Sequence, residues 1–222
     1  MDTENNELKE KREKYPRVSS ILQKQMYNEM RDIPLDRLYK ASIRGTAVHN
    51  YCTAYIEKLF MPEIEAEYLP YVDAFIEWAD EHIREVIQTR RRFYDDELRF
   101  SGEPDAILIL KDSDVPTLID IKATCATSKS WVLQLGAYRH LCMKEGFNIG
   151  RVLNVHLKKT TKTKTEKIQG EKVRVSFPVI CAKEVLPPID FNKAWEIFNS
   201  ALSCYDYFDR KEDKECSATN SP

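Results

Sequence analysis

The chain has 222 residues, of which 42% are hydrophobic and 32% charged, a composition typical of a globular protein. This length supports one substantial core, and we predict a single domain over residues 16–210. The formal net charge is −2, so the overall charge does not indicate a nucleic-acid binder. The apolar runs are too short to cross a bilayer and the acidic, polar start is unlike a signal peptide, so we expect no membrane partner.

Charged segments without a hydrophobic period lie at both ends of this domain. We predict that residues 1–15 and 211–222 are disordered, with a loose helix as the alternative for the first segment. Six cysteines are spread through the chain without CxxC spacing. This pattern favours buried free thiols in a reducing, cytoplasmic setting over a disulfide framework, an iron–sulfur cluster or a zinc site.

Hydrophobic periodicity divides the domain into helices and strands. The predicted helices cover residues 42–60, 69–88, 131–143 and 191–208. The predicted strands cover residues 92–100, 105–110, 117–122, 151–158 and 172–180. The two continuously apolar strands suit burial on both faces and are expected to be antiparallel neighbours, and the last two strands are expected to be joined by a polar hairpin loop. The order predicts an α/β fold, with a central mixed sheet flanked by helices.

Charged residues mark the ends of the two apolar strands. Asp105 opens one strand, and Asp120 and Lys122 end the other on a shared face, because alternate strand residues point the same way. Asp120 and Lys122 could simply pair with each other. Asp105, however, adds a second carboxylate, and a divalent cation would relieve the repulsion between the two. Carboxylate ligands without a nearby thiolate favour Mg²⁺ or Mn²⁺. Lys122 would then orient or deprotonate the attacking water, or stabilise charge on a phosphate.

Four segments together resemble a known family. Pro104-Asp105 followed by Asp120-Ile121-Lys122 is similar to the motif that names the PD-(D/E)xK nuclease superfamily. Three further segments resemble its RecB-like branch and occur in the order of that branch. These are Arg17-Val-Ser-Ser-Ile-Leu22, as in phage and prophage members, Arg44-Gly-Thr-Ala-Val-His49, and Gln134-Leu-Gly-Ala-Tyr138.

The resemblance implies a restriction-endonuclease-like core and a role for each matched residue. Asp105 and Asp120 match metal ligands, with a contribution from the Ile121 carbonyl, and Lys122 matches the catalytic lysine. His49 matches a residue that helps to hold the metal, although a lone histidine on an inner helical face is also typical of a satisfied core residue.

Other positions match less closely or lie outside the motifs. Gln134 and Tyr138 match residues that support the site or touch DNA, and otherwise read as neighbours on one helix surface. Glu97, on the preceding predicted strand, is a candidate further ligand or a solvated edge charge. Thr53 stands where the branch often has an acid, and the cysteines that hold an iron–sulfur cluster in some members are absent.

Two basic stretches are candidate phosphate-binding segments, or else solvated loops and helix ends. One is the arginine triplet around Arg91. The other carries five lysines and one acid between residues 158 and 167. The candidate DNA-binding residues are Arg44, Arg91, Lys158, Lys159, Lys162 and Lys164.

These features predict a Mg²⁺- or Mn²⁺-dependent deoxyribonuclease. The resemblance favours an exonuclease that hydrolyses phosphodiester bonds at DNA ends in recombination or repair. A structure-specific endonuclease would use the same site, and a non-catalytic nucleic-acid-binding module is the rival outside enzymes. The chain has no P-loop, so we expect no nucleotide cofactor. The sequence leaves open whether the protein oligomerises.

Overall fold

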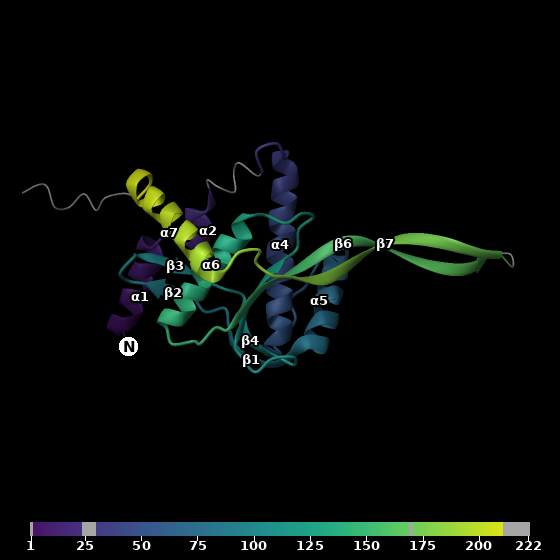
Figure 1. Ribbon diagram of the computed structural model, residues 1–222, viewed down its shortest axis with the longest axis horizontal. Helices are drawn as coiled ribbons and strands as arrows, with labels where there is room; N and C mark the ends of the chain where they lie inside the picture. The colour runs from purple at the N-terminus through teal and green to yellow at the C-terminus, as the bar shows by residue number, and fades with distance from the viewer. Residues whose placement is uncertain (1, 24–29, 169–170, 211–222) are drawn as a thin grey trace, which may run out of the picture.

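The computed structural model describes residues 2–23, 30–168 and 171–210, with the side chains of 2–6, 166–168, 171 and 173 left out (Figure 1). The C-terminal segment 211–222 lies outside the described residues. The helices are α1 (Asp2–Lys14), α2 (Val18–Ile21), α4 (Leu35–Ile56), the short 3₁₀ helix η1 (Ala66–Tyr68), α5 (Leu69–His82), α6 (Ser130–Lys144) and α7 (Phe191–Phe208). The strands are β1 (Ile83–Thr89), β2 (Phe93–Asp95), β3 (Phe100–Gly102), β4 (Ala106–Leu110), β5 (Thr117–Lys122), β6 (Arg151–Ile168) and β7 (Glu171–Val185).

Five strands form a mixed sheet in the order β1-β4-β5-β6-β7, and β2 and β3 form a separate hairpin. The pairs β1–β4, β4–β5 and β6–β7 are antiparallel, whereas β5 and β6 run parallel and are joined through α6. The predicted mixed sheet flanked by helices is therefore confirmed, as is the antiparallel pairing of the two apolar strands. Both strands are buried along their length except at Lys122.

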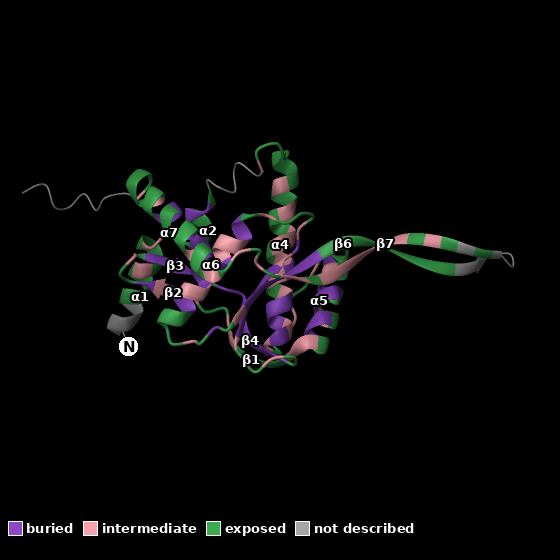
Figure 2. Cartoon of the chain, in the orientation of Figure 1, coloured by how far each residue is buried: buried purple, intermediate pink, exposed green. Residues whose placement is uncertain are grey.

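The central sheet buries a different set of side chains on each face. One face, with Ile107 and Leu118, packs in a core with α2, α6, α7 and the β2–β3 hairpin. The opposite face, with Leu108 and Ile119, packs against α4 and α5. Figure 2 shows this burial running through the strands and along the facing sides of the helices. Because β5 lies in the middle of the sheet, a polar side chain at its end must find partners within the protein or bind a ligand.

The predicted helix over 69–88 is too long at its C-terminal end. The helix α5 stops at His82, and Ile83–Thr89 forms β1 instead. The β-branched residues of this segment favour a strand, but two register shifts in its pairing with β4 disturb the alternation that would have revealed one.

The predicted strand over 92–100 is a hairpin instead. Asp95 accepts hydrogen bonds from the backbone N–H groups of Glu97 and Leu98, and Arg99 has a φ of 53°. An aspartate that bonds to the N–H groups two and three residues ahead stabilises a turn. Glu97 consequently lies in the turn between β2 and β3, not on a strand.

The predicted polar loop between residues 158 and 170 is also wrong. The strands β6 and β7 continue as an antiparallel pair up to Ile168 and Glu171. Alternating threonines with β-branched side chains favour this extended conformation, and polarity alone had suggested a loop. The resulting two-stranded arm, formed by residues 158–168 and 171–181, projects from the body of the molecule (Figure 1).

At the N-terminus, residues 2–14 form α1, whose Lys11 pairs with Asp96 on the β2–β3 turn at 2.9 Å. The expectation of buried cysteines holds for Cys52 and Cys142 but is wrong for Cys125, in the bend after β5, and for Cys204 on α7, both of which are exposed. No helix among the described residues combines the length and the apolarity needed to cross a bilayer.

Candidate active site at the ends of strands β4 and β5

The pairing of β4 with β5 stops where the charged residues begin. The last registered pair is Ala106 with Ile119, and one further step along both strands places Asp105 opposite Asp120. Residues opposite each other in an antiparallel pair share a face, with Cβ atoms about 5 Å apart. Asp105 is 8% exposed and Asp120 is 4% exposed. Two carboxylates are thus brought together with little solvent to screen them.

Asp105 is held by a helix on one side and a strand on the other. His49 on α4 places its Nδ1 3.1 Å from Oδ1 of Asp105, and the Ile121 N–H donates to Oδ2 at 2.6 Å. The burial of His49 disfavours its charged form, but the hydrogen bond to Asp105 and the negative charges of Asp105 and Asp120 together outweigh burial and raise the pKa of His49. The N–H and carbonyl of a strand residue point to the same side, so the Ile121 carbonyl also faces the edge that β4 leaves open.

Asp120 lies between a cation and an amide. Its Oδ2 is 2.6 Å from Lys122 Nζ and accepts a hydrogen bond from Asn154 Nδ2 at 3.2 Å. Burial raises the pKa of Asp120 to about 6; the positive charge of Lys122 opposes this shift and the negative charge of Asp105 adds to it. The ion pair with Lys122 therefore only partly compensates the cost of burying the Asp120 carboxylate.

A chain of hydrogen bonds fixes the catalytic candidate Lys122 from the α6 side. Lys122 Nζ donates to Gln134 Oε1 at 2.7 Å, and Gln134 Nε2 donates to the Tyr138 hydroxyl at 2.8 Å. The Lys122 ammonium also lies 5.8 Å from the centre of the Trp131 ring. Burial, reinforced by the charge of Asp120, raises the pKa of Tyr138, so this hydroxyl stays protonated. The structure thus brings together seven predicted residues: His49, Asp105, Asp120, Ile121, Lys122, Gln134 and Tyr138.

Close packing sets the position of α6 over this chain. Gly102 on β3 lies under α6, and a Cβ atom built there would come within 2.8 Å of the Tyr138 ring and within 2.7 Å of Leu141. Only glycine allows the hairpin and α6 to approach this closely. This close approach sets the position of Tyr138. The Tyr138 hydroxyl accepts a hydrogen bond from Gln134, and Gln134 in turn accepts one from Lys122.

Arg44 ties α4 to the end of β5. Its Nε donates to the carbonyl of Ala123 at 3.2 Å, and its guanidinium lies 5.3 Å from the centre of the Tyr71 ring. One turn after His49, Thr53 donates its hydroxyl to the His49 carbonyl at 2.7 Å. The Thr53 hydroxyl therefore bonds to a backbone carbonyl of its own helix, and Thr53 contributes no carboxylate to the site.

A cleft of about 210 Å³ opens beside the two carboxylates. We call it the arginine cleft; it is lined, among others, by Arg17, Arg90, Arg92, His49, Asp105 and Tyr138. The guanidinium of Arg92 bonds to Glu103 at 3.1 Å, and that of Arg90 donates to the Asn50 carbonyl at 3.0 Å. Arg17 is exposed and forms no ion pair with any residue in the described ranges. Arginine side chains at a carboxylate site offer donors for phosphate oxygens.

Several predicted residues lie elsewhere. The Glu97 carboxylate accepts a hydrogen bond from Lys144 at 3.0 Å on the β2–β3 turn, and the structure does not bring it to the other acids. The Arg91 guanidinium pairs with Glu145 at 2.5 Å and stacks over Phe93. Its neighbours Arg90 and Arg92 line the arginine cleft instead. The four predicted lysines are exposed on β6, in the arm: Lys158, Lys159, Lys162 and Lys164.

Sequence reasoning missed Asn154, Trp131 and the place of Arg17 in the cleft. Asn154 and His156 carried a usable signal, since they are polar residues two apart inside an otherwise apolar strand. Parallel pairing places Asn154 beside Asp120 and His156 beside Lys122. Trp131 gave no signal beyond its place on a helix.

The residues at the strand ends fit a hard divalent cation by their chemistry. The ligand types present are two carboxylates, the Ile121 carbonyl and the His49 imidazole, an oxygen-rich set that suits Mg²⁺ or Mn²⁺. Within residues 2–23, 30–168 and 171–210, no three His, Cys, Asp or Glu side chains already converge as a set of metal ligands. The partly compensated charge on Asp120 is the observation that favours a cation, because a nearby dication would stabilise both carboxylates.

Comparison with models of known protein families and with curated proteins gives no match for this chain.

Proposed function

We propose that this protein is a metal-dependent nuclease with a restriction-endonuclease-like core, which hydrolyses phosphodiester bonds in DNA. The observation that carries the proposal is the meeting of Asp105, Asp120 and Lys122 at the ends of two central strands. Three charged groups in a buried position cost free energy unless they serve a ligand or a reaction. The parallel step from β5 through α6 to β6 supports the proposed core, because it places Gln134 and Tyr138 over the same strand ends.

The residues divide the chemistry among themselves. Asp105, Asp120 and the Ile121 carbonyl would hold the cation, with His49 beside them. A bound divalent cation supplies activation of the attacking water and offsets charge on the phosphate. Lys122 is held by Asp120 and Gln134 at the edge of this set, where its ammonium can stabilise charge that develops on the phosphoryl oxygens, or exchange a proton with the nucleophile.

The arginine cleft gives the polyanion a place to lie. Arg17 presents an exposed guanidinium beside Asp105, and Arg90 and Arg92, which pair with Glu57 and Glu103, line the same cleft. Contacts of this kind hold a nucleic-acid backbone without reading its sequence. They also place a phosphodiester next to the carboxylates, which is what an in-line attack requires. We propose cleavage at DNA ends, in recombination or repair, on the resemblance described above.

The test is cleavage of linear, circular and single-stranded DNA in Mg²⁺, Mn²⁺ or EDTA. We expect cleavage that requires the metal and that acts on linear but not on circular DNA. Asp120→Asn removes one acid from the site and should not cleave. Glu97→Gln is its matched control, because it removes one acid outside the site, and it should cleave as the unchanged protein does. Cleavage of circular DNA would support the endonuclease alternative. Binding without cleavage in any metal would contradict the proposal and support the non-catalytic module.

A further inference from the structure

The β6–β7 arm is strongly basic and projects from the body of the molecule. The arm, residues 158–168 and 171–181, contains six lysines and one arginine against two glutamates, a net charge of +5. Because the whole chain carries −2, this leaves −7 on the remainder. Every side chain from Lys158 to Thr165 is exposed. A concentration of one sign on a projecting element indicates a partner of opposite charge.

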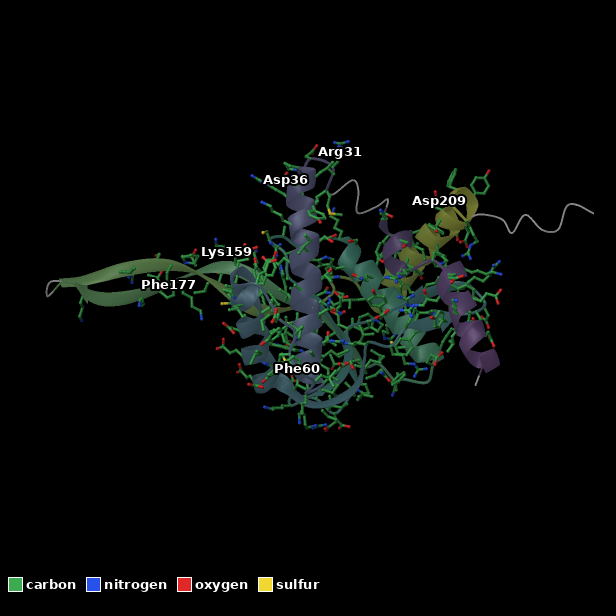
Figure 3. All side chains as sticks on the ribbon, turned by 180° about the vertical axis from the view of Figure 1, so that it is seen from behind. Arg31, Asp36, Phe60, Lys159, Phe177 and Asp209 are labelled. Carbon is green, nitrogen blue, oxygen red and sulfur yellow. The ribbon has the colours of Figure 1, made fainter. Side chains whose placement is uncertain are left out.

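The arm has both edges open along its length. The strand β5 ends at Lys122, beside His156, and β7 is the last strand of the sheet, so neither strand of the arm has an outer partner in the described part of the chain. A two-stranded ribbon of this kind is marginally stable in water by itself. Figures 1 and 3 show it extending beyond α5, with Lys159 and Phe177 on its sides. The fold does not use it to bury a core.

Cross-strand register gives the two faces of the arm different chemistry. On one face Lys158, Lys162 and Lys164 stand opposite the apolar residues Cys181, Phe177 and Val175. Lys164 Nζ lies 5.4 Å from the centre of the Phe177 ring. The other face carries Lys159, Thr161, Thr163, Ser176 and Arg174, with the apolar residues Ile180 and Pro178 opposite Lys159 and Thr161. Both faces therefore carry donors for phosphate oxygens. This arrangement suits insertion of the ribbon into a groove of the partner, where both faces would make contacts.

The dimensions of the arm match those of a duplex. From Lys158 to Lys167 the ribbon extends about 30 Å at a strand rise of ~3.4 Å per residue. One turn of duplex DNA is about 34 Å long, and its major groove admits a two-stranded β-ribbon. The right-handed twist of such ribbons is strong, and lets them follow a curved groove.

The arm also begins next to the site. Lys122 is registered with His156, which lies two residues before Lys158 on the same face of β6. A duplex held along the arm would therefore reach the strand ends at which Lys122 stands.

We propose that the β6–β7 arm binds about one turn of duplex DNA beside the cleavage site, so that the protein holds double-stranded rather than single-stranded substrate. This inference rests on the proposed nuclease function for the position of the cut. The alternative occupant is a second copy of this chain paired along an open edge. The exposed lysines oppose such edge pairing, because like charges would meet along the edge. Pro178 on β7 also opposes it, because proline has no backbone N–H to donate to an added strand.

The experiment measures binding without cleavage, by fluorescence anisotropy in EDTA. The ligands are duplexes of about 6, 10, 16 and 24 base pairs and single strands of the same lengths. The arm variant combines Lys159→Gln, Lys162→Gln, Lys164→Gln and Arg174→Gln. The control variant removes four exposed positive charges elsewhere, by Lys9→Gln, Arg84→Gln, Lys111→Gln and Lys193→Gln. A second arm variant joins Thr160 to Val179, which are registered partners, through Asn-Gly, a sequence that favours a two-residue turn.

We expect affinity for duplex to rise with length until about one turn lies along the arm, and to exceed affinity for single strands. Both arm variants should bind long duplexes at least about tenfold more weakly at ~0.1 M salt, and the slope of log K against log salt should fall by about 0.9 for each phosphate that the variant no longer neutralises. The control variant should stay within about twofold of the unchanged protein.

Three results would overturn the inference. The first is an arm variant that binds like the control variant. The second is equal loss of affinity for single strands and duplexes of every length. The third is a dimer, seen by sedimentation, that the arm variants dissociate. Failure of the nuclease proposal looks different, since duplex binding would then depend on the arm while no metal supports cleavage.

Discussion

Two buried aspartates in this protein each pair with a lysine, yet the pKa of one is lowered and the pKa of the other is raised. The Asp95 cluster consists of Asp95 with His140 Nε2 at 2.7 Å and Lys144 Nζ at 2.8 Å. Burial would raise the pKa of Asp95, but hydrogen bonds from Lys144, the Leu98 N–H and His140 outweigh it, and the pKa lies below its usual value. At Asp120 burial prevails despite Lys122, and the pKa rises to about 6.

The difference comes from how many donors reach each carboxylate and from its neighbours. Asp95 receives two backbone N–H groups in addition to its two side chains, and no other acid lies opposite it on the registered strand. Asp120 receives one lysine and one amide, and faces Asp105. The first arrangement is complete and stabilises a turn against α6. The second leaves the charge of the Asp120 carboxylate only partly compensated. Residue types alone therefore do not distinguish a structural cluster from a site, whereas the number of donors does.

The largest expected effect separates the two aspartates by metal binding. Asp120→Asn should abolish Mn²⁺ binding and cleavage without unfolding the protein, because it removes a charged ligand from a donor set that is already small. Asp95→Asn should bind Mn²⁺ with unchanged affinity. Isothermal titration with Mn²⁺ measures both. Unchanged Mn²⁺ affinity in Asp120→Asn would refute the ligand assignment.

The next largest effect should separate Lys122 from Lys144 by their contribution to turnover. Lys122→Ala should lower turnover by a factor on the order of 10² or more, because acid–base or electrostatic stabilisation acts mainly in the transition state. Its affinity for DNA in Ca²⁺ should stay close to that of the unchanged protein. Lys144→Ala removes a lysine from the Asp95 cluster and serves as the control, with turnover retained. Single-turnover kinetics on linear DNA give the comparison, and normal turnover in Lys122→Ala would exclude a catalytic role.

The Asp95 cluster should matter for stability instead. Asp95→Asn should lower the free energy of unfolding at pH 7 by about 1–3 kcal/mol, because charge-assisted hydrogen bonds to a buried acid are removed. The pKa of Asp95 is lower in the folded than in the unfolded state. Its stabilisation is therefore present above the unfolded value, about 3.9, and is lost as the pH falls through the folded value. Urea unfolding at pH 7 and at pH 3 should show the difference between the proteins shrinking in acid; equal stability at pH 7 would contradict this account.

The smallest effect is a pH dependence of metal binding, to which Asp120 and His49 both contribute. The pKa of Asp120 is raised to about 6 and the pKa of His49 is raised above its usual value, so protons compete with the metal at both side chains as the pH falls. We expect Mn²⁺ affinity to fall by about tenfold or more between pH 7 and pH 5, since protons must leave for the ion to bind. Asp95→Asn should give the same profile. Affinity that does not change between pH 7 and pH 5 would show that Asp120 is already ionised throughout this range.

The sequence predicted those parts of the fold in which period and composition agree. Thr117–Lys122 and Phe191–Phe208 begin and end where predicted, because an apolar strand and a strongly amphipathic helix each have a single reading. The segment 83–89 was misread because β-branched residues at irregular spacing satisfy a helix and a bulged strand equally well. The arm was predicted as a loop because its sequence is polar. Pairing with the neighbouring strand of the hairpin stabilises the extended conformation of this polar segment, and local composition does not reveal that pairing.

The site was predictable where it depends on side chains two apart in one strand, as for Asp120 and Lys122. It was also predictable where helix spacing applies, as for Gln134 and Tyr138, whose hydrogen bond spans one helical turn. Asn154 and the arginine cleft depend on the register of β6 against β5 and on the path of the chain after α1. Neither is encoded in local spacing, so both needed the structure.

The parallel pairing of β5 with β6 also bears on how the chain reaches its native state. The two sides of the site, Asp120 and Asn154, are separated by the whole of α6 and meet only after that crossover has closed. Such long-range pairing forms slowly, whereas the β6–β7 hairpin is closed by local contacts and can form early. We therefore expect the β6–β7 arm to form before the site during refolding. The basic ribbon would then be present in a chain in which Asp120 and Asn154 have not yet met.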